Sequence, residues 1–105
     1  MVFTSPINTA SDPDSLLAAK LGTITVPVLI VGDTEDTCYV TLPSSNGAVR
    51  KYLKHSPRVS VEVVSGAGLI PLSDACNALS GHGFFGVEDT AVRKISSWIS
   101  GGECE

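Results

Sequence analysis

One histidine of the chain lies in a glycine-rich segment, where its imidazole could act as a general base. His82 belongs to the stretch GHGFFG, and a run of twelve residues, Leu69–Ser80, separates it from an earlier GAG. A general base needs a partner that orients its ring and a group from which it takes a proton. His82 is a candidate catalytic residue only if both are supplied.

Two other patterns could indicate a cofactor or a metal. GHGFFG satisfies G-x-G-x-x-G through Gly81, Gly83 and Gly86. A dinucleotide fingerprint follows a strand directly and opens a βαβ unit, whereas no strand follows the helix predicted after this segment. We therefore interpret it as a turn and expect no cofactor. The cysteines and histidines show neither C-x-x-C nor H-x-x-x-H spacing, so no metal site is predicted.

Size and composition limit the class of protein. The 105 residues are enough for one domain, and the chain is 43% hydrophobic and 17% charged, as expected of a globular protein. A net charge of -4 gives no reason to expect nucleic-acid binding. The apolar runs are too short to cross a bilayer, and the first residues lack the features of a secretory signal. We expect no membrane partner.

The cysteine count favours a reducing compartment. Cys38, Cys76 and Cys104 are an odd number of residues at wide spacing. This pattern favours reduced thiols over a disulfide framework, so the predicted localisation is cytoplasmic.

Three helices and two strands are expected. Residues 1–11 are predicted to be an irregular arm, residues 12–100 a single α/β domain and residues 101–105 a tail. A first helix is capped by Asp12 and ends at Gly22, and a second begins at Ser44 or Ser45. The apolar spacing of residues 91–99 predicts the third helix, behind Glu88 and Asp89 and ended by Gly101 and Gly102.

The predicted strands indicate a parallel sheet. Val26–Val31 is apolar at nearly every position, which is typical of a strand buried on both faces, and Val59–Val64 is a second strand with alternating valines. With helices between them, the fold class is α/β: a short parallel β-sheet with flanking helices. A sheet of only two strands is marginally stable, and a strand as apolar as Val26–Val31 needs neighbouring strands on both edges. We expect another chain, a second copy or a complementary protein, to complete the sheet.

The order of these segments resembles a known family. ITVPVLIVGDTEDT, RVSVEVVSGAG and HGFFGVEDTAVRKISSWI together resemble the C-terminal third of α/β-hydrolase fold proteins of the esterase and lipase class, over roughly residues 22–100. The resemblance implies that Asp36 is the triad acid and His82 the triad histidine. The loop GDTED is one residue longer than the commonest form, so Glu35 is the alternative acid.

The chain departs from that family in two places. LIPLSDACNALSG, residues 69–81, stands as an insertion before His82, and its removal would give SGAGHGFFGVEDTAV with the family spacing. No serine stands in G-x-S-x-G, the turn that presents the family's nucleophile, and acid and base without it give no acyl transfer.

Three readings of the function remain open. The first is a truncated or degenerate hydrolase that does not hydrolyse esters as a lone chain, or one half of a split serine hydrolase. The second is a small protein-interaction module that pairs through an exposed edge of Val26–Val31. A receiver-like or flavodoxin-like module is disfavoured, because the second strand leads into Ser65-Gly66 with no acceptor aspartate. Whether the chain is an enzyme is left open.

Overall fold

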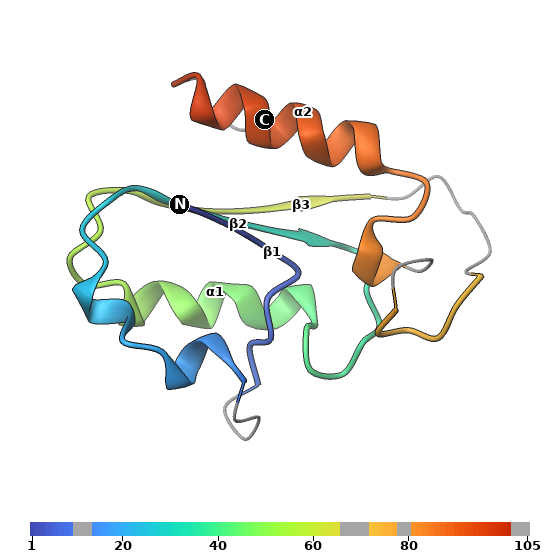
Figure 1. Ribbon diagram of the computed structural model, residues 1–105, viewed down its shortest axis with the longest axis horizontal. Helices are drawn as coiled ribbons and strands as arrows, with labels where there is room; N and C mark the ends of the chain where they lie inside the picture. Colours follow the sequence, from blue (N-terminus) through green and yellow to red (C-terminus); the bar gives the residue numbers. More distant parts are fainter. Residues whose placement is uncertain (10–13, 66–71, 78–80, 102–105) are drawn as a thin grey trace.

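The sheet has three parallel strands. The computed structural model describes residues 1–9, 14–65, 72–77 and 81–101. Strands β1 (Val2–Thr4), β2 (Val28–Asp33) and β3 (Val59–Val64) lie in the order β1-β2-β3, and both pairs are parallel (Figure 1). The predicted fold class, an α/β domain with a short parallel sheet, is confirmed.

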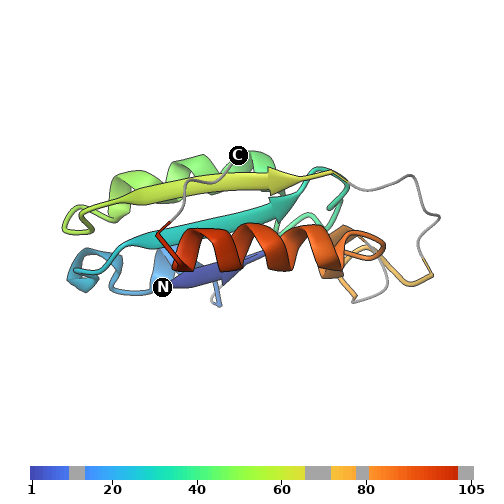
Figure 2. The same ribbon diagram turned by 90° about the horizontal axis from the view of Figure 1, so that it is seen from above.

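The central strand β2 is buried on both faces, because helical layers lie on either side of the sheet (Figure 1). In the view from above, the C-terminal helix lies in front of the sheet (Figure 2). Val28 and Ile30 pack with Leu21 and Leu53 on one face, while Leu29 and Val31 pack against Trp98 on the other. Successive side chains of a strand point to opposite faces, so a strand covered twice must be apolar at every position. This requirement explains the four consecutive apolar residues VLIV, 28–31, at the start of β2.

Helix α2 (Glu88–Ile99) covers one face of the sheet. Its Ala91 and Trp98 are buried, and the Trp98 indole N–H donates to the Ser60 hydroxyl of β3 at 3.2 Å. The two acidic residues predicted at its beginning lie in its first turn. Its end is followed by Gly101 in the left-handed region (φ 87°). No helix among the described residues is long and apolar enough to cross a membrane.

The opposite face is covered by shorter helical segments. Residues 43–52 form one helical run made of η3 (Pro43–Ser45), α1 (Asn46–Val49) and η4 (Arg50–Tyr52), where the second helix was predicted. The first predicted helix is wrong in its described part. Residues 16–23 form two separate 3-10 turns, η1 (Leu16–Ala18) and η2 (Leu21–Thr23), and its cap at Asp12 lies outside the described residues. Gly22 lowers the helix propensity of this segment, whereas isolated three-residue 3-10 turns form even where that propensity is low.

The N-terminal residues correct a second prediction. β1 forms within the arm that was expected to be irregular, with Val2 opposite Leu29 and Thr4 opposite Val31. The second neighbour that β2 requires is therefore part of the same chain. The exposed edge predicted for Val26–Val31 is wrong, because β2 is paired on both sides and the open edges belong to β1 and β3. A strand of three residues is too short to show a pattern in the sequence.

Candidate functional site

The carboxyl ends of the three parallel strands meet at one edge of the sheet, and polar residues gather there. Ser5 follows β1, and Asp36 lies in the loop after β2. The 3-10 turn η5 (Gly81–Gly83) carries His82 to the same edge, where the Ser5 hydroxyl donates to the His82 carbonyl at 2.9 Å. Open parallel sheets bind ligands at this edge, so the location suits a site.

The Asp36 carboxylate, the Thr41 hydroxyl and the His82 ring form a hydrogen-bonded chain. The Thr41 hydroxyl donates to Asp36 Oδ2 at 2.9 Å, and Thr41 Oγ1 lies 3.0 Å from His82 Nδ1. Asp36 Oδ2 is itself 3.5 Å from Nδ1. Because the hydroxyl hydrogen is given to the carboxylate, Thr41 accepts from the ring, and Nδ1 carries the hydrogen. The lone pair of Nε2 is then available as a base.

The acid loop is built to hold the Asp36 side chain. Asp36 is buried, and its Oδ1 accepts a hydrogen bond from the Cys38 backbone N–H at 3.0 Å. The Thr41 N–H donates to the Cys38 carbonyl, which brings the Thr41 side chain back to the carboxylate. A buried carboxylate is costly unless donors surround it, and these local turns supply them.

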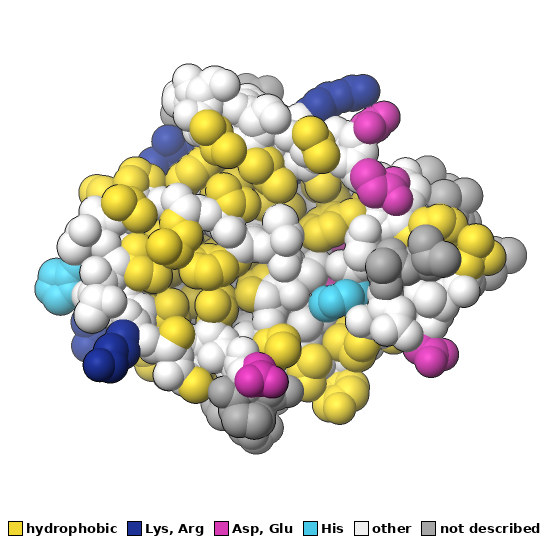
Figure 3. Space-filling view, viewed as in Figure 1, with side chains coloured by type: hydrophobic (Ala, Val, Ile, Leu, Met, Phe, Trp, Pro, Cys, Tyr) yellow, Lys and Arg dark blue, Asp and Glu magenta, His cyan; other side chains and the backbone are white. Residues whose placement is uncertain are grey.

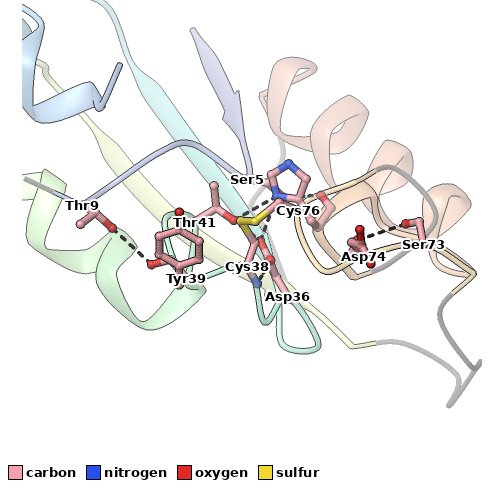
Figure 4. Close-up of a disulfide and its surroundings, with 10 residues drawn as sticks. Ser5, Thr9, Asp36, Cys38, Tyr39, Thr41, Ser73, Asp74 and Cys76 are labelled. Atoms are coloured by element: carbon pink, nitrogen blue, oxygen red, sulfur yellow. Dashed lines mark hydrogen bonds and ion pairs between the residues drawn. A yellow bond between two sulfur atoms is a disulfide. The ribbon is translucent and has the colours of Figure 1, made fainter. Parts of the chain in front are cut away.

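A disulfide ties the acid loop to the segment that precedes His82. Cys38 and Cys76 are bonded, with their Cα atoms 4.7 Å apart, and Figure 4 shows the bond beside Asp36 and Thr41. The reduced thiols predicted for this pair are therefore wrong. The two cysteines are 38 residues apart, and a loop of that length corresponds to about 4 kcal/mol of stabilisation in the chain-entropy model. Such bonds are typical of extracellular, oxidising compartments.

The histidine turn lies directly against the acid loop. A Cβ placed on Gly81 would overlap the Glu35 carbonyl and stand 2.8 Å from the Asp36 N, so this position accepts only glycine without movement. Two non-glycine residues near the turn, Ser5 (φ 43°) and Phe84 (φ 59°), adopt the left-handed region. Backbone strain of this kind concentrates at functional sites.

The structure brings two of the three sequence-predicted site residues together. Asp36 and His82 are neighbours, whereas Glu35, the alternative acid, is exposed and contributes its backbone to the contact with Gly81. Much of the proposed insertion, residues 69–71 and 78–80, lies outside the described residues, together with GAG. Whether either residue is catalytic stays a prediction.

Sequence reasoning missed the residues that hold this pair in place. These residues are Thr41, Ser5 and the two bonded cysteines. Each has a partner in the cluster at least 35 positions away in the sequence, so no local motif contains the pair. One signal was present. Cys76 lies inside the segment interpreted as an insertion, and Cys38 lies in the acid loop, so a covalent link between the two loops was conceivable from the sequence.

A second buried carboxylate stands at the end of β2. Asp33 is fully buried, and its Oδ1 accepts from the Glu35 N–H at 2.9 Å, while Oδ2 has no hydrogen-bond partner among the described residues. Desolvation raises the pKa of Asp33, the negative charges of Glu35 and Asp36 raise it further, and the Glu35 N–H opposes the shift.

Chemically, the arrangement offers an oriented base, and within the described part of the chain the only hydroxyl hydrogen-bonded to its ring is that of Thr41. The carboxylate and hydroxyl fix the imidazole tautomer, which is the positioning role of the acid in hydrolase triads. Comparisons of this chain with protein-family models, with curated proteins and with solved structures found no match.

Replacing Gly81 by alanine tests the close approach of the two loops. We expect Gly81→Ala to lower the free energy of unfolding by about 1–3 kcal/mol, because the new methyl group overlaps the Glu35 backbone and one loop must shift. Gly47→Ala is the matched control, since nothing lies within 4 Å of its Cβ position in α1, and it should be neutral or stabilising. Urea unfolding followed by Trp98 fluorescence measures both; equal effects would contradict the contact.

Asp33 should make stability depend on pH. Its raised pKa means that the folded chain binds this proton more tightly than the unfolded chain, whose carboxyl has a pKa near 3.8. The contribution of Asp33 to the free energy of unfolding is therefore greatest below that value. It falls as pH rises toward the raised pKa of the folded state. Asp33→Asn keeps the oxygen that accepts from Glu35 N–H and removes the charge. We expect a flatter pH profile and a gain of about 1 kcal/mol at neutral pH.

Urea unfolding of both proteins between about pH 4 and about pH 8 measures this difference. Asp74→Asn, at an exposed position, serves as the control and should leave the profile unchanged. A contribution of Asp33 that increases with pH would contradict the assignment.

Proposed function

We propose that this chain is the acid–imidazole part of an α/β-hydrolase-type site and that it does not hydrolyse esters by itself. The observation that carries the proposal is the chain of contacts from Asp36 Oδ2 through the Thr41 hydroxyl to His82 Nδ1. It stands at the carboxyl ends of parallel strands, and it leaves Nε2 to accept a proton. The threonine hydroxyl between acid and ring makes the orientation of the ring depend on three side chains.

Among the described residues, no hydrogen bond brings a nucleophile to Nε2 of His82. No serine of the sequence stands in G-x-S-x-G, and the described contacts of the Ser5 hydroxyl lead to a backbone carbonyl and not to the His82 ring. Covalent acyl transfer needs a nucleophile within reach of the base and amide donors for the oxyanion. Under the proposal, a complementary polypeptide supplies both, as in a split serine hydrolase.

The β1 edge is where additional strands would bind. Met1 O accepts from Leu29 N, and Ser5 N donates to Val31 O, so the alternate residues Val2 and Thr4 direct their backbone groups away from β2. Between this edge and α2 lies an apolar groove of about 190 Å³, lined by Thr4, Gly83, Phe84, Glu88, Ala91, Val92 and Ile95. Figure 3, viewed from the β1 side, shows hydrophobic side chains spread over this face.

The same edge favours a second function, a protein-interaction module. Val92 and Ile99 in α2 are 60% and 66% exposed, whereas Ala91 and Trp98 of the same helix are buried. On the β3 side, by contrast, α2 carries Lys94, which pairs with Glu62 at 3.9 Å. An exposed apolar stripe beside an open strand edge suits a second copy of this chain.

The redox state of Cys38 and Cys76 depends on the compartment in which the chain is located. A cytoplasmic location stays a prediction, and there the Cys38–Cys76 pair would be kept reduced. In an oxidising compartment the bond persists and holds the acid loop against the histidine turn. The proposed acid–imidazole function belongs to the oxidised chain.

The tautomer of His82 tests the first proposal. We expect the neutral ring of the oxidised wild-type chain to carry its hydrogen on Nδ1, read from long-range ¹H–¹⁵N correlation spectra. Asp36→Asn should reduce that preference, because an amide no longer requires the Thr41 hydroxyl to donate to it. Glu35→Gln is the matched control and should leave the tautomer unchanged, since Glu35 is exposed.

Two results would contradict the proposal. A tautomer that responds to Glu35→Gln and not to Asp36→Asn would exclude Asp36 as the acid. Hydrolysis of a p-nitrophenyl ester by the purified chain, abolished by His82→Ala, would show that the lone chain possesses a nucleophile.

Self-association tests the second function. We expect sedimentation velocity to show a concentration-dependent dimer that Thr4→Pro weakens at least about tenfold, because proline removes an outward-directed N–H and disfavours pairing at that edge. The control is Tyr39→Ala, which removes an exposed apolar side chain outside β1 and α2 and should leave the dimer unchanged. A strictly monomeric chain would contradict edge pairing between copies.

A further inference from the structure

Three side chains that can ligate a metal meet at the junction of the acid loop and the histidine turn. One ligand atom each of Asp36, Cys38 and His82 lies within 4.8 Å of the other two. The sulfur of Cys76 is bonded to that of Cys38, so reduction would place a second thiol beside these three residues. Asp36 and Cys38 are buried, the His82 side chain is 26% exposed, and Cys76 is exposed. The junction is therefore buried on the side of the acid loop and open to solvent at the imidazole and at Cys76.

The spacing of these atoms suits a tetrahedral ion. In a tetrahedral zinc site with metal–ligand distances of 2.0–2.2 Å, the nitrogen and oxygen ligands stand about 3.4 Å apart. His82 Nδ1 and Asp36 Oδ2 are 3.5 Å apart. Two thiolates, one imidazole nitrogen and one carboxylate oxygen form a donor set that favours zinc over harder cations such as magnesium.

We propose that, when the Cys38–Cys76 disulfide is reduced, this cluster binds one zinc ion through Cys38, Cys76, Asp36 and His82. A dithiol reductant supplies two electrons and two protons, which convert the disulfide into two thiols while the reductant itself becomes a disulfide. Zinc binding then displaces both thiol protons to solvent, because the thiolate is the ligand. The His82 ring changes to the tautomer with its hydrogen on Nε2, so that the Nδ1 lone pair faces the ion.

Breaking the sulfur–sulfur bond makes the geometry accessible. Two thiolates on one tetrahedral zinc ion stand about 3.8 Å apart at a metal–sulfur distance of 2.3 Å. The Cα atoms of Cys38 and Cys76 are 4.7 Å apart in the disulfide, and reduction removes the bond that fixes the two sulfur atoms. The Thr41 hydroxyl remains within hydrogen-bond distance of the Asp36 carboxylate and orients it as an outer partner.

The oxidised and metal-bound states exclude each other. In the disulfide state His82 Nδ1 faces Thr41 and Asp36, as the acid–imidazole function requires. In the zinc state the same nitrogen and carboxylate are ligands, so that function is lost. The metal site does not depend on ester hydrolysis, and its test reads metal binding alone.

Cobalt substitution tests the site. The full chain, reduced with a phosphine under anaerobic conditions, is titrated with Co²⁺. We expect one ion per chain, with the intense visible bands of tetrahedral Co²⁺ and a near-ultraviolet thiolate-to-cobalt band, both removed by zinc. The oxidised chain should show neither.

Variants separate the ligands from bystanders. His82→Gln and Asp36→Asn should each weaken zinc binding at least about tenfold, and they should change the visible cobalt bands while the thiolate band remains. Cys76→Ser should remove much of the thiolate band. His55→Gln and Cys104→Ser, which replace the other histidine and the third cysteine, are the matched controls and should leave binding unchanged.

Circular dichroism keeps the test decisive if the reduced chain unfolds. Metal binding and folding are coupled in small zinc sites, so zinc should then restore the helical signal. A reduced chain that neither binds Co²⁺ tetrahedrally nor refolds with zinc would overturn the proposal. Binding that is unaffected by both His82→Gln and Asp36→Asn would overturn it as well.

Discussion

The carboxylate of Asp36, buried in the loop after β2, must be surrounded by hydrogen-bond donors, and this need organises one end of the molecule. Asp36 obtains its donors from the Cys38 backbone and the Thr41 hydroxyl, with the His82 ring beside them. Each donor requires a particular loop conformation. The acid loop therefore folds back on itself, and the histidine turn has to approach closely enough that Gly81 has no room for a side chain.

The parallel sheet gives that carboxylate its place. Because β1, β2 and β3 run in the same direction, the loops after them emerge at the same edge, and residues separate in sequence become neighbours. Ser5, Asp36 and His82 meet for this reason. The same three-stranded sheet leaves the short strand β1 open, with an apolar groove beside it. The site and the open edge are thus two consequences of one topology.

The Cys38–Cys76 bond connects the two loops that the sheet alone only brings near each other. With the bond formed, the imidazole is held against Asp36 and Thr41. Under the zinc proposal, reduction would let both sulfur atoms act as ligands with Asp36 and His82. The chemistry of His82 would then depend on the redox state of two residues whose spacing in the sequence does not relate them.

The sequence by itself determined the fold class, the buried central strand and the last helix, because consecutive apolar residues and helical spacing are local signals. It also pointed to Asp36 and His82, through a family resemblance. Only the tertiary structure decided that β1 pairs with β2, that Thr41 stands between acid and ring, and that Cys38 bonds Cys76. The paired residues of β1 and β2 are 27 positions apart, Cys38 and Cys76 are 38 apart, and Thr41 and His82 are 41 apart. A pairing over such a distance depends on how the sheet and loops pack, which no short stretch of sequence records.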